Sequence, residues 1–165
     1  MVQAQPPETK LAYPLIKGYG EVVPRPNAAY QPQKGEKAVF DITSGGKPEA
    51  LNKGLERAAR LVNLYGSAGL KAGDFQLVLV LHGDATGATM TDAGYATMFQ
   101  TKSNPNTELI GLLHQAGVKI YVCGQALNYK KIADDQVRKD IPIALSALNV
   151  VIKEQSAGAA YIPVP

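Results

Sequence analysis

The sequence predicts an α/β layered domain with a mostly parallel sheet of about five strands flanked by helices. Strand-sized apolar runs alternate along the chain with helical patterns, and the links between them are short. One of these runs, FQLVLVLHG, is apolar almost throughout, which is typical of a strand buried on both faces. We therefore expect an α/β domain over residues 37–165, preceded by an extended, proline-containing arm over residues 1–36.

The first half of the domain is expected to contain two strands and two helices. KAVFDIT is the first strand, and EALNKGLERAARLVNLYGSAG has apolar residues at spacings of three and four, which predicts an amphipathic helix ending at Gly66 or Gly69. FQLVLVLHG is the second strand. NPNTELIGLLHQAG then predicts a helix with Asn104 as its N-cap and Pro105 in its first turn.

The second half repeats this alternation. VKIYVC is the third strand, GQALNYKKI opens a short helix, and IPIAL is a fourth apolar run. SALNVVIKEQSAG predicts a helix with Ser146 as its N-cap. AYIPV is expected at the edge of the sheet, because Pro163 has no backbone N–H to donate to a second neighbouring strand, as an inner strand would require. Ligands of such sheets bind beyond the carboxyl ends of the strands, so residues that follow strands are the candidates for a site.

Composition and charge argue against several classes of protein. The formal net charge is +3, but Lys and Arg are scattered, which does not indicate nucleic acid binding. The longest apolar runs are far shorter than the roughly 20 residues of a membrane-spanning helix. A single cysteine excludes an intrachain disulfide and a multi-cysteine metal site.

Two polar loops follow the first two strands. DITSGGKP resembles a phosphate-binding loop only superficially, because Asp41 stands at the first glycine position and Pro48 at the hydroxyl position. A flexible turn at Gly45 and Gly46 is the simpler interpretation, with anion binding at the following helix as the alternative. GDATGATMTD lacks the spacing of a dinucleotide-binding loop, and we interpret it as a lid or rim loop.

Cys123 and His82 are the candidate reactive side chains. Cys123 ends the third strand directly before Gly124, where the N–H groups of a helix start would stabilise a thiolate. The alternative is a packed thiol, since free cysteine often behaves as a small buried hydrophobe. His82 ends the second strand and could carry protons or partner the thiolate. His114 falls within a helical leucine pattern, where a packed or solvent-edge histidine is expected.

The segment VKIYVCGQAL, with LVLVLHG before it and IPIALSALNVVIKEQSAGAAYIP after it, resembles the DsrE/DsrF-like family, which includes YchN-like proteins. The likeness runs over residues 37–165. It implies assembly into a homo-oligomer, a trimer or hexamer, and a cysteine that carries sulfane sulfur as a persulfide. That cysteine falls on Cys123. The long arm looks like the extension of exported family members, so a periplasmic or otherwise exported protein is expected, with a cytoplasmic one as the alternative.

The resemblance therefore implies a sulfur-trafficking protein, a sulfurtransferase or sulfur carrier, that passes sulfur from Cys123 to an acceptor thiol. It implies no metal or organic cofactor, and a donor or acceptor protein as partner. Gly83, Gly124 and Gln125 are expected to contact the substrate, and His82 to assist proton movement. Two alternatives stay open: an oligomeric small-ligand-binding module in which Cys123 is structural, and a flavin- or nucleotide-binding protein.

Overall fold

A computed structural model describes residues 10–165, and within them five parallel strands form one sheet. The strands lie in the order β4-β3-β2-β1-β5. Their bounds are Lys37–Ile42 for β1, Gln76–Leu81 for β2, Lys119–Cys123 for β3, Ile143–Ala144 for β4 and Ala160–Val164 for β5. This confirms the predicted fold class. It also places AYIPV at the edge of the sheet, as its proline suggested.

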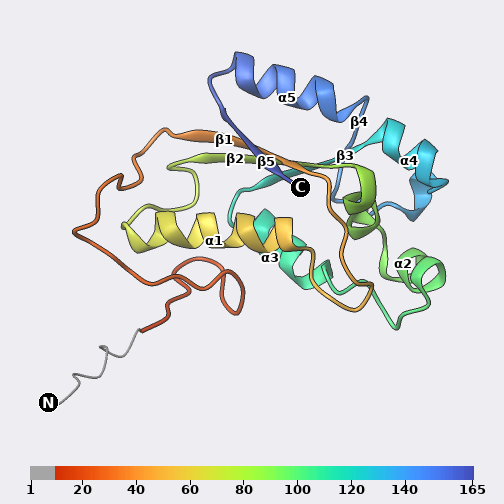
Figure 1. The fold of residues 1–165 in the computed structure, drawn as a ribbon, viewed down its shortest axis with the longest axis horizontal. Helices are drawn as coiled ribbons and strands as arrows, with labels where there is room; N and C mark the ends of the chain where they lie inside the picture. The colour runs from red at the N-terminus through yellow and green to blue at the C-terminus, as the bar shows by residue number, and fades with distance from the viewer. Residues whose placement is uncertain (1–9) are drawn as a thin grey trace, which may run out of the picture.

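Helices cover both faces of the sheet. The helices are α1 (Lys53–Ser67), α2 (Asp92–Phe99), α3 (Thr107–Gln115), α4 (Gly124–Lys130) and α5 (Ala147–Ser156), with 3₁₀ turns η1 (Gly83–Thr89) and η2 (Asp134–Gln136). Figure 1 shows α1 and α3 below the sheet and α5 above it. The larger apolar cluster lies between the sheet and α1 and α3, whereas smaller clusters lie under α5. The α5 side of the sheet is therefore the more open one.

The strand and helix patterns explain this layering. All residues of β2 from Leu77 to Leu81 are buried, as expected for an inner parallel strand. Helix α1 begins at Asn52, whose side chain accepts hydrogen bonds from the N–H groups of Gly54 and Leu55. Ser146 caps α5 by accepting from the N–H of Leu148, which confirms the predicted cap.

Two predictions between β2 and β3 were wrong. Helix α3 begins after Asn106, two residues later than predicted. The side-chain oxygen of the buried Asn104 accepts from the N–H of Asn106, ahead of the helix, and its amide nitrogen donates to the carbonyls of Ala88 and Met90. The segment predicted as a lid or rim loop is the 3₁₀ turn η1, which is buried from residue 85 to 89 and is therefore no open lid. Its buried threonine side chains are satisfied within the turn: the hydroxyl of Thr86 donates to the carbonyl of Gly83, and that of Thr89 to the carbonyl of Thr86.

Residues 10–36 lie against α1 and carry neither helix nor strand, apart from one isolated bridge between Ala12 and Val22. Figure 1 shows this segment passing below α1. Ile16 is 1% exposed and belongs to the main apolar cluster. Asn63 of α1 binds the arm: its amide oxygen accepts from two backbone N–H groups, and its amide nitrogen donates to three carbonyls. The partners are Leu15 and Ile16 for the oxygen, and Ile16, Tyr19 and Gly20 for the nitrogen.

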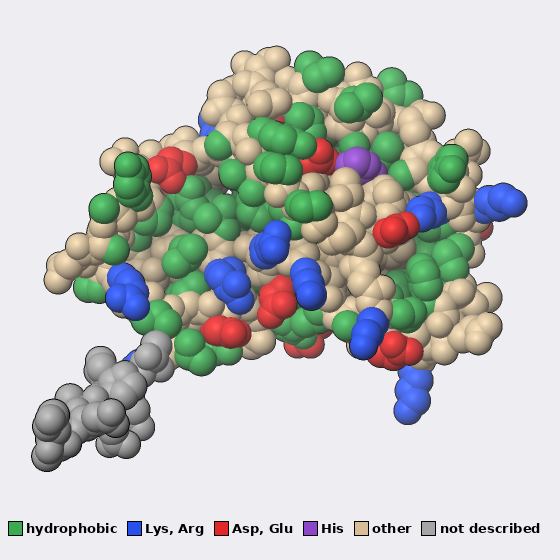
Figure 2. Space-filling view, viewed as in Figure 1, with side chains coloured by type: hydrophobic (Ala, Val, Ile, Leu, Met, Phe, Trp, Pro, Cys, Tyr) green, Lys and Arg blue, Asp and Glu red, His purple; other side chains and the backbone are tan. Residues whose placement is uncertain are grey.

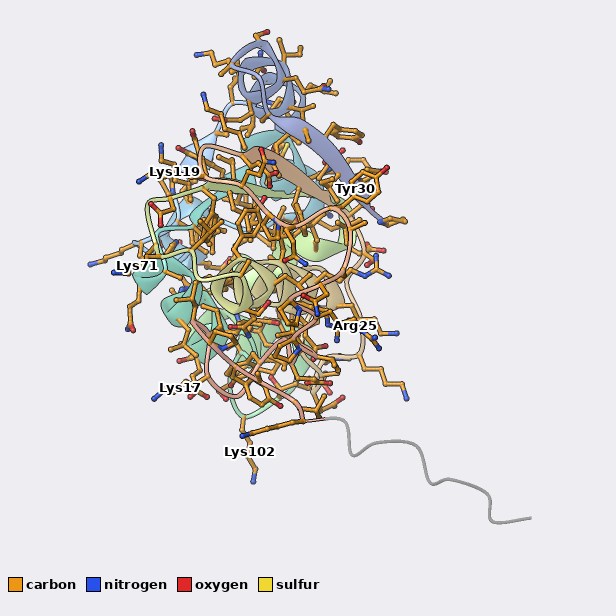
Figure 3. All side chains as sticks on the ribbon, turned by 90° about the vertical axis from the view of Figure 1, so that its left-hand side faces the viewer. Lys17, Arg25, Tyr30, Lys71, Lys102 and Lys119 are labelled. Atoms are coloured by element: carbon orange, nitrogen blue, oxygen red, sulfur yellow. The ribbon has the colours of Figure 1, made fainter. Side chains whose placement is uncertain are left out.

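The basic side chains labelled in Figure 3, Lys17, Arg25, Lys71, Lys102 and Lys119, point away from the molecule in several directions. The absence of nucleic acid binding stays a prediction. Over residues 10–165, no helix has the length and apolar character needed to span a membrane. The export prediction rests on the arm, whose first nine residues lie outside the described residues, and export also stays a prediction.

Candidate functional site

A cavity of about 490 Å³ lies at the carboxyl ends of β1, β2 and β3, on the side of the sheet covered by α5. This is the position at which ligands of parallel sheets bind. Four of the five residues expected at the site line it: Cys123, His82, Gly83 and Gln125. The cavity is also lined by side chains that sequence patterns did not single out as site residues, among them Asp41, Tyr161 and Lys130.

Cys123 is the last residue of β3 and the N-cap of α4. Its side chain is directed at the α5 side of the sheet, where it packs with Val80 and Ala147, and the residue is 5% exposed. The side chain makes no capping hydrogen bond to α4. The first N–H groups of a helix have no partner within it, so a negatively charged sulfur at this position has donors nearby.

Four side chains form a row across four neighbouring strands. Leu81 of β2 pairs with Val122 of β3, so the residues that follow them, His82 and Cys123, are neighbours in register. Asp41 of β1 pairs with Val80 and therefore lies on the same side of the sheet as Cys123. Tyr161 of β5 completes the row. We call Cys123, His82, Asp41 and Tyr161 the cross-strand row.

Asp41 joins its two neighbours in the row by hydrogen bonds. The distance from His82 Nε2 to Asp41 Oδ1 is 2.6 Å, and the hydroxyl of Tyr161 donates to Asp41 Oδ2 at 2.7 Å. The bond to Asp41, more than burial, raises the pKa of Tyr161 above its ordinary value, so the phenol remains a donor. No hydrogen bond joins His82 to Cys123, so a proton passing between them needs a substrate group or a water molecule.

The glycines and Gln125 have structural partners that explain their residue types. Gln125 donates its side-chain N–H to the carbonyl of Leu145 at 3.0 Å, which ties α4 to the start of α5. Gly83 has φ +55°, and a Cβ there would meet the carbonyl oxygen of Thr43 at 3.2 Å. Gly124 lies outside the cavity lining, and a Cβ would meet the carbonyl oxygen of Ala144 at 3.0 Å. Close packing is thus one reason for glycine at both positions.

A sequence profile of the DsrE/DsrF-like family matches residues 37–164. The chain belongs to the DsrE/DsrF-like family. This family is generally associated with sulfur transfer. Comparison with curated proteins gives no match.

Two solved structures share the fold of this DsrE/DsrF-like protein. One is the protein of unknown function MTH1491 from Methanobacterium thermoautotrophicum, with 16% identity and a TM-score of 0.58 over 78% of this chain and 98% of that chain. The other is the YchN protein from E. coli, with 17% identity and a TM-score of 0.53 over 78% of this chain and 97% of that chain. At such low identity, the likeness shows the fold alone.

Asp41 and Tyr161 were missed because they lie within strands that were interpreted as packing elements. A carboxylate inside an otherwise apolar strand was a usable signal, since buried charges require partners. Tyr161 had no such signal, because its role depends on the pairing of β1 with β5. Lys130, also missed, forms an ion pair with Asp84 beside the cavity.

Within residues 10–165, no three His, Cys, Asp or Glu side chains are placed to hold a metal ion. At the SGGKP turn, the side chain of Asn52 already binds two first-turn N–H groups of α1 and donates to the carbonyls of Ser44 and Gly45. The turn is thus held by its own helix cap, which weakens the anion-binding alternative.

Proposed function

We propose that this protein carries sulfane sulfur as a persulfide on Cys123 and passes it to an acceptor thiol. The observation that carries the proposal is the position of the chain's single thiol in the wall of a cavity that also holds His82, itself bonded to a carboxylate. A thiol, a proton carrier and a bounded space are the elements that sulfur transfer needs. The family's association with sulfur transfer supports the same chemistry.

The proposed loading step is a displacement at sulfur. The Cys123 thiolate attacks the outer sulfur of a donor persulfide, R–S–SH, and forms a new S–S bond. The S–S bond of the donor breaks, and its electron pair leaves with R–S⁻, which takes up a proton. In the second step an acceptor thiolate attacks the outer sulfur of Cys123–S–SH and releases the Cys123 thiolate. One sulfur atom moves in each step, and no external oxidant or reductant is needed.

The cavity residues have distinct roles in this proposal. His82 takes the thiol proton and returns it to the leaving sulfur through the substrate or one water molecule. Gly83 and Gln125 line the cavity where the donor enters, and the N–H of Gln125 in the first turn of α4 stabilises the charged sulfur. With about 490 Å³, the cavity has room for a small persulfide or for the terminal residue of a partner's sulfur-bearing segment.

Loading is tested by intact-protein mass spectrometry after incubation with inorganic polysulfide. We expect the wild-type protein to gain whole sulfur atoms and to lose them on treatment with a reductant. Cys123→Ser should gain none, because serine cannot form the S–S bond. Circular dichroism of both proteins checks that the fold is unchanged. Loading of the serine variant to the wild-type level would rule out Cys123 as the carrier.

A second function has one observation in its favour. Cys123 is only 5% exposed and packs among apolar side chains, as a structural cysteine would. In that case the protein is a non-catalytic module that binds a small ligand in the cavity. This function predicts no sulfur gain on wild-type protein, under conditions that load an accessible thiol such as glutathione, together with slow alkylation of Cys123.

We also propose that the protein assembles with itself through the outer surface of α5. This surface is apolar and exposed: Leu145 and Leu148 are each 73% exposed, and Ile152 is 61% exposed. Exposed green side chains are visible over α5 at the top of Figure 2. Neighbouring apolar side chains on β4 and β5 extend it, namely Ile143 and Tyr161. Clustered exposed apolar residues of this kind mark interaction surfaces, and a trimer or hexamer is the assembly that we expect.

A charge on this surface should dissociate the assembly. Ile152→Glu is expected to convert the oligomer into monomers, because the carboxylate would lose its water on assembly. The measurement is light scattering on a size-exclusion column at several protein concentrations. Met98→Glu is the matched control, since Met98 on α2 is also an exposed apolar residue, at 39%, but lies away from α5. An oligomer that survives Ile152→Glu would place the interface elsewhere.

A further inference from the structure

The cross-strand row contains a carboxylate with two hydrogen-bond partners and no place in the transfer chemistry itself. We infer that Asp41 is a positioning residue, which fixes the imidazole of His82 for proton exchange with Cys123 and is itself held by Tyr161. This inference rests on the proposed function, because it assigns roles around the same thiol.

Hydrogen bonding determines which nitrogen of His82 carries the proton. Tyr161 donates its hydroxyl to Asp41 Oδ2, and an ionised carboxylate has no hydrogen to donate. Nε2 of His82, 2.6 Å from Oδ1, must therefore be the donor in the second bond. In the neutral ring Nδ1 is then the acceptor, and it makes no hydrogen bond within the described residues. Asp41 thus selects the tautomer in which Nδ1 is free to receive a proton.

Packing alone does not explain a carboxylate at this position. Asp41 lies within β1, between two strands, and its side chain is 18% exposed. An apolar side chain would suit such a place, because a carboxylate loses hydration there and requires partners. Its neighbours on the same side of β1 and β2, Val39 and Val80, are fully buried aliphatic residues. Asp41 is thus the charged residue among these aliphatic positions, and it is the residue that binds His82.

The other charged and titratable groups around the cavity do not compete for His82. Lys130 is engaged with Asp84 in an ion pair, and Tyr129 is 85% exposed. Asp41, Tyr161 and Cys123 are therefore the titratable groups left in the cavity wall beside His82, and among them Asp41 binds the imidazole. The sign of the effect follows from this set. Asp41 keeps Nδ1 of His82 free to take the thiol proton, so removing the carboxylate should make Cys123 less reactive at neutral pH.

The tautomer is measured by long-range ¹H–¹⁵N correlation spectra of ¹⁵N-labelled protein. We expect wild-type His82 to carry its proton on Nε2, and Asp41→Asn to give a mixture of tautomers. The chain has two histidines. His82→Gln therefore assigns the signals, and His114 serves as an internal reference. A wild-type His82 protonated on Nδ1, or an unchanged tautomer in Asp41→Asn, would overturn the inference.

The consequence for Cys123 is measured as its rate of alkylation by iodoacetamide between pH 5 and pH 10. At pH 7 we expect Asp41→Asn to react about tenfold more slowly than wild type, and the midpoint of its pH profile to move upward. Tyr161→Phe, which removes one bond to Asp41, should lower the rate about threefold. Asp41→Glu, which keeps the charge, should recover part of the rate. A midpoint that moves downward would mean that Asp41 acts on the thiol by direct repulsion, contrary to the inference.

A matched control comes from the second histidine. His114 Nδ1 lies 3.3 Å from Asp140 Oδ2, so Asp140→Asn removes a carboxylate from a histidine outside the cavity. It should leave the alkylation profile of Cys123 unchanged. If Asp41→Asn does not fold, the inference is tested with Tyr161→Phe, on the edge strand. An alkylation rate and pH profile of Tyr161→Phe equal to those of wild type would count against the inference. Neither readout uses sulfur loading, so failure of the proposed function and failure of this inference are distinguishable.

Discussion

Replacing Asn63 by alanine is expected to lower the free energy of unfolding by about 3 kcal/mol, one of the two largest stability effects predicted for this chain. The residue is fully buried, and its amide makes five hydrogen bonds to the backbone of the arm. Alanine would leave those N–H and carbonyl groups without partners and away from water. The measurement is urea denaturation followed by circular dichroism.

The same variant should release the arm from α1. Trypsin should then cut after Lys17 faster in Asn63→Ala than in wild type, because the arm backbone would be accessible. Asn128→Ala is the control, since Asn128 is an exposed asparagine on α4 and its loss should change stability by less than about 0.5 kcal/mol. A cost below about 1 kcal/mol for Asn63→Ala would show that the arm is not held by this side chain.

Gly20→Ala is the second large effect, with an expected loss of about 3 kcal/mol. Gly20 has φ +62°, and a Cβ there would lie 2.3 Å from the backbone nitrogen of Arg60 and 2.6 Å from the carbonyl carbon of Ala59. The methyl group would therefore collide with the backbone of α1, which cannot move aside as a flexible side chain could.

Gly18→Ala separates the collision from the backbone strain. Gly18 also has a positive φ, +83°, but a Cβ there would meet nothing within 4 Å. It should therefore lose only the roughly 1–2 kcal/mol of the left-handed conformation. Both variants are compared with wild type by urea denaturation. Equal losses in the two would mean that the arm does not pack as closely on α1 as the structure shows.

The layered fold could be predicted because its signals are local. The apolar run of β2 and the spacing of apolar residues in α1 each lie within one element, and their alternation indicates a parallel sheet. The buried turn η1 was misjudged for the opposite reason: its polar composition resembles an exposed loop, yet Thr86 and Thr89 satisfy their hydroxyls within the turn. The start of α3 was placed two residues early because the amide nitrogen of Asn104 binds carbonyls of the preceding segment, a contact that the local pattern does not reveal.

The site could be predicted only where chain position was sufficient. Cys123 ends strand β3 and His82 directly follows strand β2, and the topology of a parallel sheet brings such residues to one edge. The roles of Asp41 and Tyr161 depend on which strands are neighbours. The placement of β5 beside β1 cannot be derived from either segment alone, since the hydrogen bond between these residues spans 120 positions.

That separation has a consequence for the order of events during synthesis. Strand β1 has its inner neighbour β2 available early, whereas β5 is translated 120 positions later, which takes about 6 s or more at typical rates. Until then the Asp41 edge of the nascent sheet has no partner strand, and Asp41 has no phenol to bind. A ribosome stalled before β5 would hold a chain whose thiol, histidine and carboxylate have been made but whose cross-strand row is incomplete. The full arrangement therefore arises only near the end of translation of this domain.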